Sequence, residues 1–149
     1  MPAIQNIVVP VDFSPTSIRA FEYAFDLGKK LQATLHVVHV YPLPTYLFPD
    51  GAVMAGPEFT EQVSSAAQRE LDAMLKPYLD QGVVIEYRIT QGVPHESIHQ
   101  YADEVKADMI VMGTHGRTGI THLLMGSIAE RVVRTSTIPV LTVPQKQSD

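Results

Sequence analysis

Short β-branched runs alternate along the chain with longer amphipathic segments. The compact apolar run in IQNIVVPV (4–11) is typical of a strand buried on both faces, and so is the run DMIVMG (108–113). Three further runs also predict strands: TLHVVHV (34–40), VVIEYRIT (83–90) and PVLTV (139–143). The pattern therefore predicts five strands.

The segments between these runs carry the signals of helix starts and helix ends. Ser14 and Pro15 supply a cap followed by proline at the first helical position, which predicts a helix from this point to about Leu31. Pro77 is expected to kink the second predicted helix (58–81) or end it early, because proline has no N–H to donate to the hydrogen bond that continues a helix. The further helices are predicted over 58–81, 94–106 and 127–136.

Strands and helices that alternate in this way imply parallel strands, with right-handed helical crossovers that cover both faces of one sheet. We therefore predict a Rossmann-like, three-layer α/β/α fold with a five-stranded parallel sheet of order 3-2-1-4-5, formed by a single domain over 1–144. In such a sheet the strand order reverses between the first and fourth strands. Ligands bind at that point, beyond the carboxyl ends of the strands.

Two segments do not belong to this minimal fold. Residues 41–57, YPLPTYLFPDGAVMAGP, predict a long loop, which is either a tolerated insertion or a lid or interface. Residues 145–149, QKQSD, predict a flexible tail.

Composition narrows the class of protein. The 149 residues include no cysteine, which excludes disulfides and cysteine-bound metals. The formal net charge of −5 argues against general nucleic-acid binding, which needs a basic surface. No apolar run approaches the roughly 20 residues that span a bilayer, and the N-terminus lacks the features of a secretory signal. We therefore expect neither a nucleic-acid partner nor a membrane partner.

The predicted fourth strand runs into a glycine-rich stretch, MGTHGRTGITHLLMGS (112–127). Its spacing, Gly113-x2-Gly116-x9-Gly126-Ser127, is neither a Walker A motif nor the dinucleotide fingerprint. Glycines nevertheless let backbone N–H groups approach a ligand closely, and a helix that starts at Gly126 presents free N–H groups to an anion. With Arg117 as a nearby positive charge, the stretch favours phosphate binding.

The same residues also have a purely structural explanation, which the spacing leaves open. Ser127 and Glu130 fit a capping box, in which case the glycines only turn the chain. Asp12, the one carboxylate expected near the floor of the crevice, likewise fits a turn or cap before Ser14.

The segment GTHGRTGITHLLMGSIAERVVRTSTIPVLTVP (113–144) resembles the C-terminal signature of the universal stress protein family. The segment IVVPVDFSPTSIRAFEYAFDLGKK (7–30) resembles the first strand–helix unit of the same family. The resemblance covers the chain apart from 41–57 and the tail, and the glycine spacing is that of the branch that binds ATP. It implies a cytoplasmic stress-response or signalling protein that holds ATP with Mg²⁺.

The resemblance also implies roles for individual residues. The end of the first strand should approach adenine and ribose, and Val40 should contact adenine through its backbone. The phosphate path should follow residues 115–117, and the β- and γ-phosphates should meet Gly126 and Ser127. Mg²⁺ should bridge phosphate oxygens, and no protein ligand for it is assigned. The implied cofactor-binding residues are Pro10, Val11, Asp12, Val40, Met112, Gly113, His115, Gly116, Arg117, Gly126, Ser127 and Ile128.

The last predicted strand suggests self-association. Its residues are Val140, Leu141, Thr142 and Val143, and such an apolar edge after Pro139 invites pairing with another chain. The resemblance implies the same, a homodimer joined through these strands. The alternative is that the tail covers this edge.

Three functions remain open at this point. The first is an ATP-binding stress-response or signalling module that is not an enzyme, with at most slow ATP hydrolysis. The second is a phosphohydrolase or nucleotidyl transferase that uses ATP, although no second carboxylate for a metal pair is evident. The third is a dimeric interaction module without a nucleotide.

Overall fold

The computed structural model describes residues 3–42, 45–49, 51–54, 56–115 and 125–146 of the chain. The elements are β1 (Asn6–Pro10), α1 (Pro15–Leu31), β2 (Thr34–Tyr41), β3 (Thr45–Phe48), β4 (Gly51–Met54), α2 (Pro57–Leu75), the 3₁₀ turn η1 (Lys76–Tyr78), β5 (Ile85–Gln91), α3 (Pro94–Glu104), β6 (Met109–Gly113), α4 (Ser127–Thr135) and β7 (Val140–Val143).

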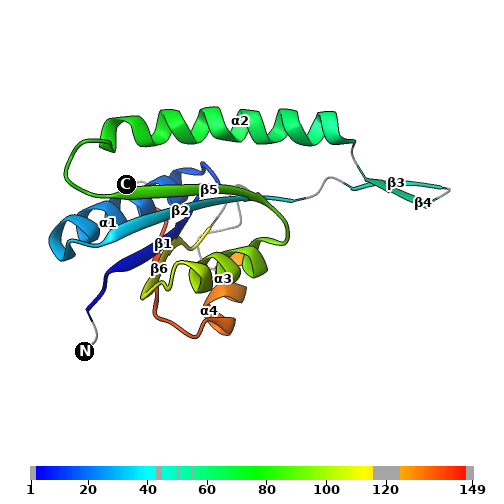
Figure 1. The fold of residues 1–149 in the computed structure, drawn as a ribbon. Coiled ribbons are helices and arrows are strands. Elements are labelled where there is room, and N and C mark those ends of the chain that lie inside the picture. The colour runs from blue at the N-terminus through cyan, green and yellow to red at the C-terminus, as the bar shows by residue number, and fades with distance from the viewer. Residues whose placement is uncertain (1–2, 43–44, 50, 55, 116–124, 147–149) are drawn as a thin grey trace.

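The main sheet has five parallel strands in the order β5-β2-β1-β6-β7. Counted along the chain without the two short strands β3 and β4, this is the predicted order 3-2-1-4-5, so the predicted fold class is confirmed. Figure 1 shows α1 and α2 on one face of the sheet and α3 and α4 on the other. The molecule is therefore a three-layer α/β/α sandwich.

Each face of the sheet has its own hydrophobic core, because successive strand residues point to opposite sides. In β1, Ile7 and Val9 pack toward α1 and α2, whereas Val8 packs toward α3 and α4. All three side chains are fully buried. This explains why the sequence of β1 is continuously apolar instead of alternating.

The predicted signals at helix ends are confirmed for α1 and α2. The Ser14 side chain accepts a hydrogen bond from the backbone N–H of Ser17, and Pro15 is the first residue of α1. The second helix ends at Leu75 and continues as η1 around Pro77, well before the predicted end at 81. Proline thus ends this α-helix early, as its missing N–H requires.

Residues 41–57 were predicted to be a long loop, and this prediction is wrong in its main part. β3 and β4 form an antiparallel hairpin in which Thr45 pairs with Met54 and Phe48 with Gly51. The segment also contributes Tyr41 to the end of β2 and Pro57 to the start of α2. The segment was predicted to be a loop because of its many prolines and glycines. This content was given more weight than the strand propensity of Tyr46, Leu47 and Phe48.

The other boundaries differ from the prediction by a few residues at most. The third predicted strand is β5 and starts at Ile85 instead of 83, and α3 ends at Glu104 instead of 106. Pro139 precedes β7, and its carbonyl accepts a hydrogen bond from Ile110 in the neighbouring strand. No helix of the described part of the chain is long and apolar enough to cross a membrane.

Candidate functional site

The strand order places one crevice at the carboxyl ends of β1 and β6, which are neighbours in the sheet. After β1 the chain passes to α1 on one face, whereas α4, which follows β6, lies on the other face (Figure 1). Adjacent strands whose connections leave in opposite directions open a gap between them, and ligands of open α/β sheets bind there.

The start of α1, on one side of this crevice, is closed by its own side chains. The Asp12 carboxylate accepts the backbone N–H of Ser14 over 2.9 Å, so the expected turn role of Asp12 is present. The Ser14 hydroxyl accepts the N–H of Ser17, and the Ser17 hydroxyl accepts the N–H of Asp12. Pro15 has no N–H. This helix start is therefore capped from within the chain.

The start of α4, on the other side, is open. Gly126 is the N-cap residue, and it makes no side-chain capping bond. Within the described residues, the backbone N–H groups of Ser127, Ile128 and Ala129 have no hydrogen-bond partner. Ser127 and Ile128 are exposed. Three free donors at the positive end of a helix dipole form a binding place for an anion.

The capping box, which the spacing left open as an alternative for Ser127 and Glu130, is therefore not formed among the described residues. Ser127 is the first helical residue instead of the cap, so its hydroxyl does not stand over the helix end. The Glu130 carboxylate forms an i,i+4 pair with Arg134, 3.4 Å away, and does not reach back to the start of the helix. The structural explanation of the glycine-rich stretch thus loses its main support.

Gly113 was interpreted as a turn glycine, but it is the last residue of β6 and does not have a positive φ. A Cβ built on it would lie 2.7 Å from the Thr16 side chain and 3.1 Å from the Thr16 backbone carbon and oxygen. The first turn of α1 thus packs directly against Gly113. Here glycine is required by close packing, which the spacing alone did not reveal.

Backbone hydrogen bonds fix both ends of the glycine-rich stretch to the sheet. Thr114 donates its N–H to Val143 in β7, and its carbonyl accepts the N–H of Gly126 over 2.6 Å. The N–H of Gly126 is therefore occupied, and the donors left for a phosphate begin one residue later, at Ser127. His115 follows, with Nδ1 2.9 Å from the Thr114 hydroxyl and Nε2 buried without a partner among the described residues.

The ends of β1 and β2 form the opposite wall of the crevice. The carbonyl of Val38 in β2 accepts the N–H of Val11, so the backbone groups of Val38 face β1. Along a strand, successive residues direct their N–H and C=O groups to opposite edges. The N–H and C=O groups of Val40, two residues further on, therefore also face the β1 side. β1 has ended there, which leaves them open to the crevice. His39 donates from Nδ1 to the Val11 carbonyl, a contact that sequence reasoning missed.

Phe13, which sequence reasoning also missed, lies immediately after Asp12 and has φ of 64°. Such a conformation is uncommon for a residue with a side chain and is held by surrounding contacts. The Phe13 ring packs on the His39 ring, with 4.6 Å between centroids. The turn after β1 is therefore fixed from β2, through a histidine that only the tertiary structure connects with it.

Most of the predicted binding residues thus lie around one crevice, from Pro10, Val11, Asp12 and Val40 on one wall to Met112, Gly113, His115, Gly126, Ser127 and Ile128 on the other. Gly116 and Arg117 lie outside the described residues, so the predicted phosphate path at these two positions remains a prediction. Within the described residues, no cluster of histidine, aspartate or glutamate has the geometry of a metal site.

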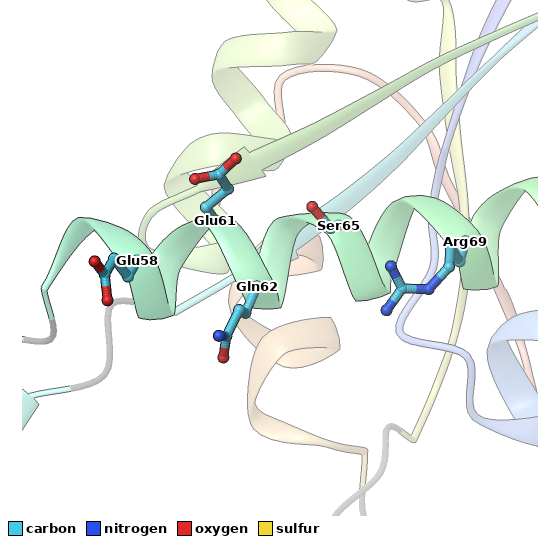
Figure 2. A pocket seen from close by; sticks show the side chains of 5 residues that line it. All are labelled: Glu58, Glu61, Gln62, Ser65 and Arg69. Carbon is cyan, nitrogen blue, oxygen red and sulfur yellow. The ribbon is translucent and has the colours of Figure 1, made fainter.

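A hollow of about 350 Å³ lies elsewhere, along α2. Figure 2 shows the side chains that line it, all of them from this one helix: Glu58, Glu61, Gln62, Ser65 and Arg69. Side chains along one exposed helix do not enclose a small molecule on opposite sides, as a ligand pocket must. The crevice between β1 and β6 is therefore the candidate site.

Comparison with known proteins shows the family to which the chain belongs. Residues 3–144 match the universal stress protein family. A universal stress protein of Methanocaldococcus jannaschii is 31% identical over 147 residues, which cover 97% of this chain and 85% of the relative.

Solved structures show the same fold. A universal stress protein from Lactobacillus plantarum is 26% identical, with a TM-score of 0.80 over 96% of this chain and 99% of the other. A universal stress protein solved in complex with cAMP is 31% identical, with a TM-score of 0.66 over 95% and 98% of the two chains. The chain belongs to the universal stress protein family.

Proposed function

We propose that this protein binds ATP in the crevice between β1 and β6 and acts as a nucleotide-dependent module of the cytoplasmic stress response. The observation that carries the proposal is the open start of α4, where Ser127, Ile128 and Ala129 offer backbone N–H groups at the switch point of the sheet. These donors suit a phosphate group. The relative solved with cAMP supports the adenine part of the proposal.

The residues around the crevice also fit a ligand with a base and a sugar. The open backbone groups of Val40 lie on the wall opposite α4, where they suit the polar edge of adenine. At the end of β6, the side chain of Met112 is buried. Gly113, the next residue, allows the first turn of α1 to pack close to this strand end. A Mg²⁺ ion would be held mainly by the phosphates and by water, because the described residues provide no cluster of ligands for it.

In this proposal the protein is a binding module that hydrolyses ATP slowly at most. Among the described residues at the ends of β1 and β6, Asp12 is the one carboxylate, and it accepts the N–H of Ser14. A two-metal site, or a general base for the attacking water, would need a further group. An enzyme with rapid turnover therefore has less support from this crevice.

Calorimetric titration of the purified protein with ATP, AMP and cAMP, each with and without Mg²⁺, tests the proposal. We expect ATP to bind most tightly, because its triphosphate offers more acceptor oxygens to these N–H donors than the single phosphate of AMP or cAMP. We also expect ADP to form over hours. Equal affinity for all three nucleotides would contradict phosphate binding at α4. Many turnovers per minute would favour the phosphohydrolase alternative, and no binding at all would favour a module without a nucleotide.

We also propose a homodimer joined through β7. β7 pairs with β6 along one edge, and within the described chain no strand pairs with its other edge. Leu141 is 37% exposed in this strand, and Val133 of α4 is also exposed. An exposed apolar edge of this kind is prone to pair with other chains, and a partner strand that covers it removes this tendency. Leu141→Lys should halve the mass measured by sedimentation if β7 forms the interface.

A further inference from the structure

The outer side of β5 is the second open edge of the main sheet. β5 stands at the end of the strand order opposite β7, and in the part of the chain that the structure describes no strand pairs with its outer side. Figure 1 shows β5 in front of the other strands, with α2 above it and α3 below it. Three residues at its centre, Glu86, Tyr87 and Arg88, are exposed. An open strand edge of this kind is a template for a strand of another chain.

Two hydrogen bonds to β2 show which backbone groups of β5 lie on the outer edge. The Val84 carbonyl accepts the N–H of Leu35 over 2.9 Å. At the other end of the strand, Gly92 donates its N–H to the Tyr41 carbonyl over 3.1 Å. Successive residues of a strand direct their backbone groups to opposite edges, so the even-numbered residues of β5 face β2. The residues that face outward are Ile85, Tyr87, Ile89 and Gln91.

Opposite charges flank Tyr87 on one face of this edge. Alternate residues of a strand share a face, so Glu86 and Arg88 both lie on the side of α3. The Arg88 guanidinium pairs with Glu104 of α3. It also lies over the ring of Tyr101, 4.5 Å from its centroid. These contacts hold the positive charge in place, and an arginine has five N–H donors, which is enough for a second carboxylate.

The Glu86 carboxylate is accessible to a further partner. Its Oε2 atom lies 3.3 Å from His36 Nδ1, but the side chain is 62% exposed. Charged side chains usually protect an edge strand, because like charges meet when two copies of the strand pair. β5 carries one charge of each sign, placed symmetrically about Tyr87, and this protection fails in one register.

The register decides which charges meet when two β5 strands pair antiparallel. With the two-fold axis at Glu86 or at Arg88, that residue lies opposite its own copy, and like charges repel. An axis at Ile85 or Ile89 places both charges opposite uncharged residues. With the axis at Tyr87, Glu86 lies opposite Arg88 of the second copy, once on each side of the axis. Only this register therefore forms two attractive charge pairs.

The backbone favours the same register. Tyr87 faces outward, so its two copies at the axis exchange both of their N–H···O bonds. Glu86 and Arg88 then lie between the hydrogen-bonded pairs, where opposite Cα atoms are about 4.5 Å apart and side chains are closest. Ile85 lies opposite Ile89 of the second copy and forms a further hydrogen-bonded pair. We propose that β5 pairs antiparallel with β5 of a second copy of this chain, around a two-fold axis at Tyr87.

This interface is separate from the nucleotide crevice and from β7. β5 and β7 are opposite edges of the sheet, so pairing at one edge leaves the other accessible. A protein that used both edges would assemble beyond a dimer. The test of β5 therefore uses a full-length parent protein that carries Leu141→Lys, which blocks pairing through β7. We expect this parent protein to be a dimer.

Two charge variants of the parent protein test the register by sedimentation over a series of concentrations. Glu86→Lys gives β5 two positive charges, and Arg88→Glu gives it two negative charges. Each variant alone brings like charges together twice, so we expect its dimer dissociation constant to rise by roughly tenfold or more. In an equimolar mixture the opposite charges meet again, and we expect dimers to form as readily as in the parent protein.

The mixture distinguishes a broken interface from a damaged fold. Two misfolded variants would not restore a dimer on mixing, and a mixture that stays monomeric would contradict the proposal. A parent protein that is monomeric at every concentration would also overturn it. So would a dimer that neither substitution weakens, because that dimer would use another surface.

Single cysteines locate the axis, since the natural chain has none. Tyr87→Cys places the two thiols side by side, with Cα atoms about 5.5 Å apart, and a short bismaleimide should join them. Val84→Cys is the control, because Val84 is 61% exposed and lies away from the axis. At about 3.4 Å per residue, its two copies would be roughly 20 Å apart. Equal yields of cross-linked dimer at both positions would contradict the proposed register.

Discussion

The two helix starts at the crevice, those of α1 and α4, differ in how their backbone N–H groups are used. α1 begins with Ser14 and Pro15, so one of its first N–H groups is absent and another is bound by the cap. α4 begins at Gly126 without any side-chain cap, and three of its N–H groups have no partner in the part of the chain that the structure describes. Both helices present the positive end of a dipole, and among the described residues that of α4 is left without a cap.

This difference assigns separate roles to the two helix starts, namely stability at α1 and ligand binding at α4. The serine and aspartate residues at α1 stabilise the fold, whereas the backbone of α4 is available for function. The two helix starts are also linked, since Thr16 of α1 packs against Gly113 and Thr114 holds Gly126. A change at α1 should therefore affect stability, and a change at α4 should affect the nucleotide. The following predictions test this division, from the largest effect to the smallest.

Gly113→Ala tests the packing between α1 and β6. An alanine in place of a glycine usually stabilises a protein by about 0.4–1 kcal/mol where φ is compatible, as it is here. The new Cβ would meet the Thr16 backbone at 3.1 Å, so we expect a loss of about 1–3 kcal/mol in the free energy of unfolding instead. Urea denaturation measures the sign directly. A more stable variant would show that α1 does not pack as closely as the structure indicates.

Ser127→Pro makes the start of α4 resemble that of α1. Proline is well tolerated as the first helical residue, and Gly126 already has the extended conformation that a residue before proline prefers, with φ of −60° and ψ of 155°. The variant should keep its stability but lose one phosphate donor. A charge-assisted hydrogen bond contributes about 1.5–3 kcal/mol, so ATP affinity should fall by roughly tenfold or more.

Ser127→Ala is the matched control for this experiment, because it removes the hydroxyl and keeps the N–H. Calorimetry should show nearly unchanged ATP affinity in this variant. If alanine weakens binding as much as proline does, the hydroxyl contacts the ligand and the backbone N–H is not the donor.

Ser14→Ala tests the opposite side of the comparison. Loss of a serine cap costs a helix about 0.5–2 kcal/mol, and we expect a decrease of about 1 kcal/mol in the free energy of unfolding. ATP affinity should not change, since the cap is satisfied within α1. A clear loss of affinity without a loss of stability would place Ser14 in the binding site and remove the distinction between the two helix starts.

The smallest expected effect concerns His36, which lies in β2 away from both helix starts. Burial lowers its pKa below the usual 6.5, an effect that the nearby Glu86 carboxylate partly opposes. The folded protein therefore binds this proton less readily than the unfolded chain does. The contribution of His36 to stability is complete above about pH 6.5 and decreases as the pH falls below that value.

Unfolding by urea at pH 7.5 and pH 5.5 measures this dependence, and His36→Gln should reduce it. The glutamine amide can still donate to the Asn6 side chain, which His36 Nε2 contacts at 2.9 Å. ATP affinity should not respond to His36→Gln at either pH. A response would mean that the crevice is coupled to this end of β2.

The sequence predicted the architecture well because the signals for it are local. Each strand of the main sheet has its own apolar run, and Ser14 with Pro15 marks the start of α1 within a few residues. Element order then fixes a parallel sheet and the place of its crevice. The hairpin at 45–54 was missed because its prolines and glycines resemble a loop, and its pairing depends on register.

The sequence by itself therefore determined the family, the sheet and the position of the glycine-rich stretch beside the crevice. Only the tertiary structure decided what the residues there do. It showed that Gly113 makes room for Thr16, that Gly126 instead of Ser127 is the cap, and that the start of α4 has N–H groups without a partner among the described residues. These facts depend on atoms brought together from distant parts of the chain. A pattern within one segment records which residues follow one another, but it does not record which backbone N–H groups find a partner.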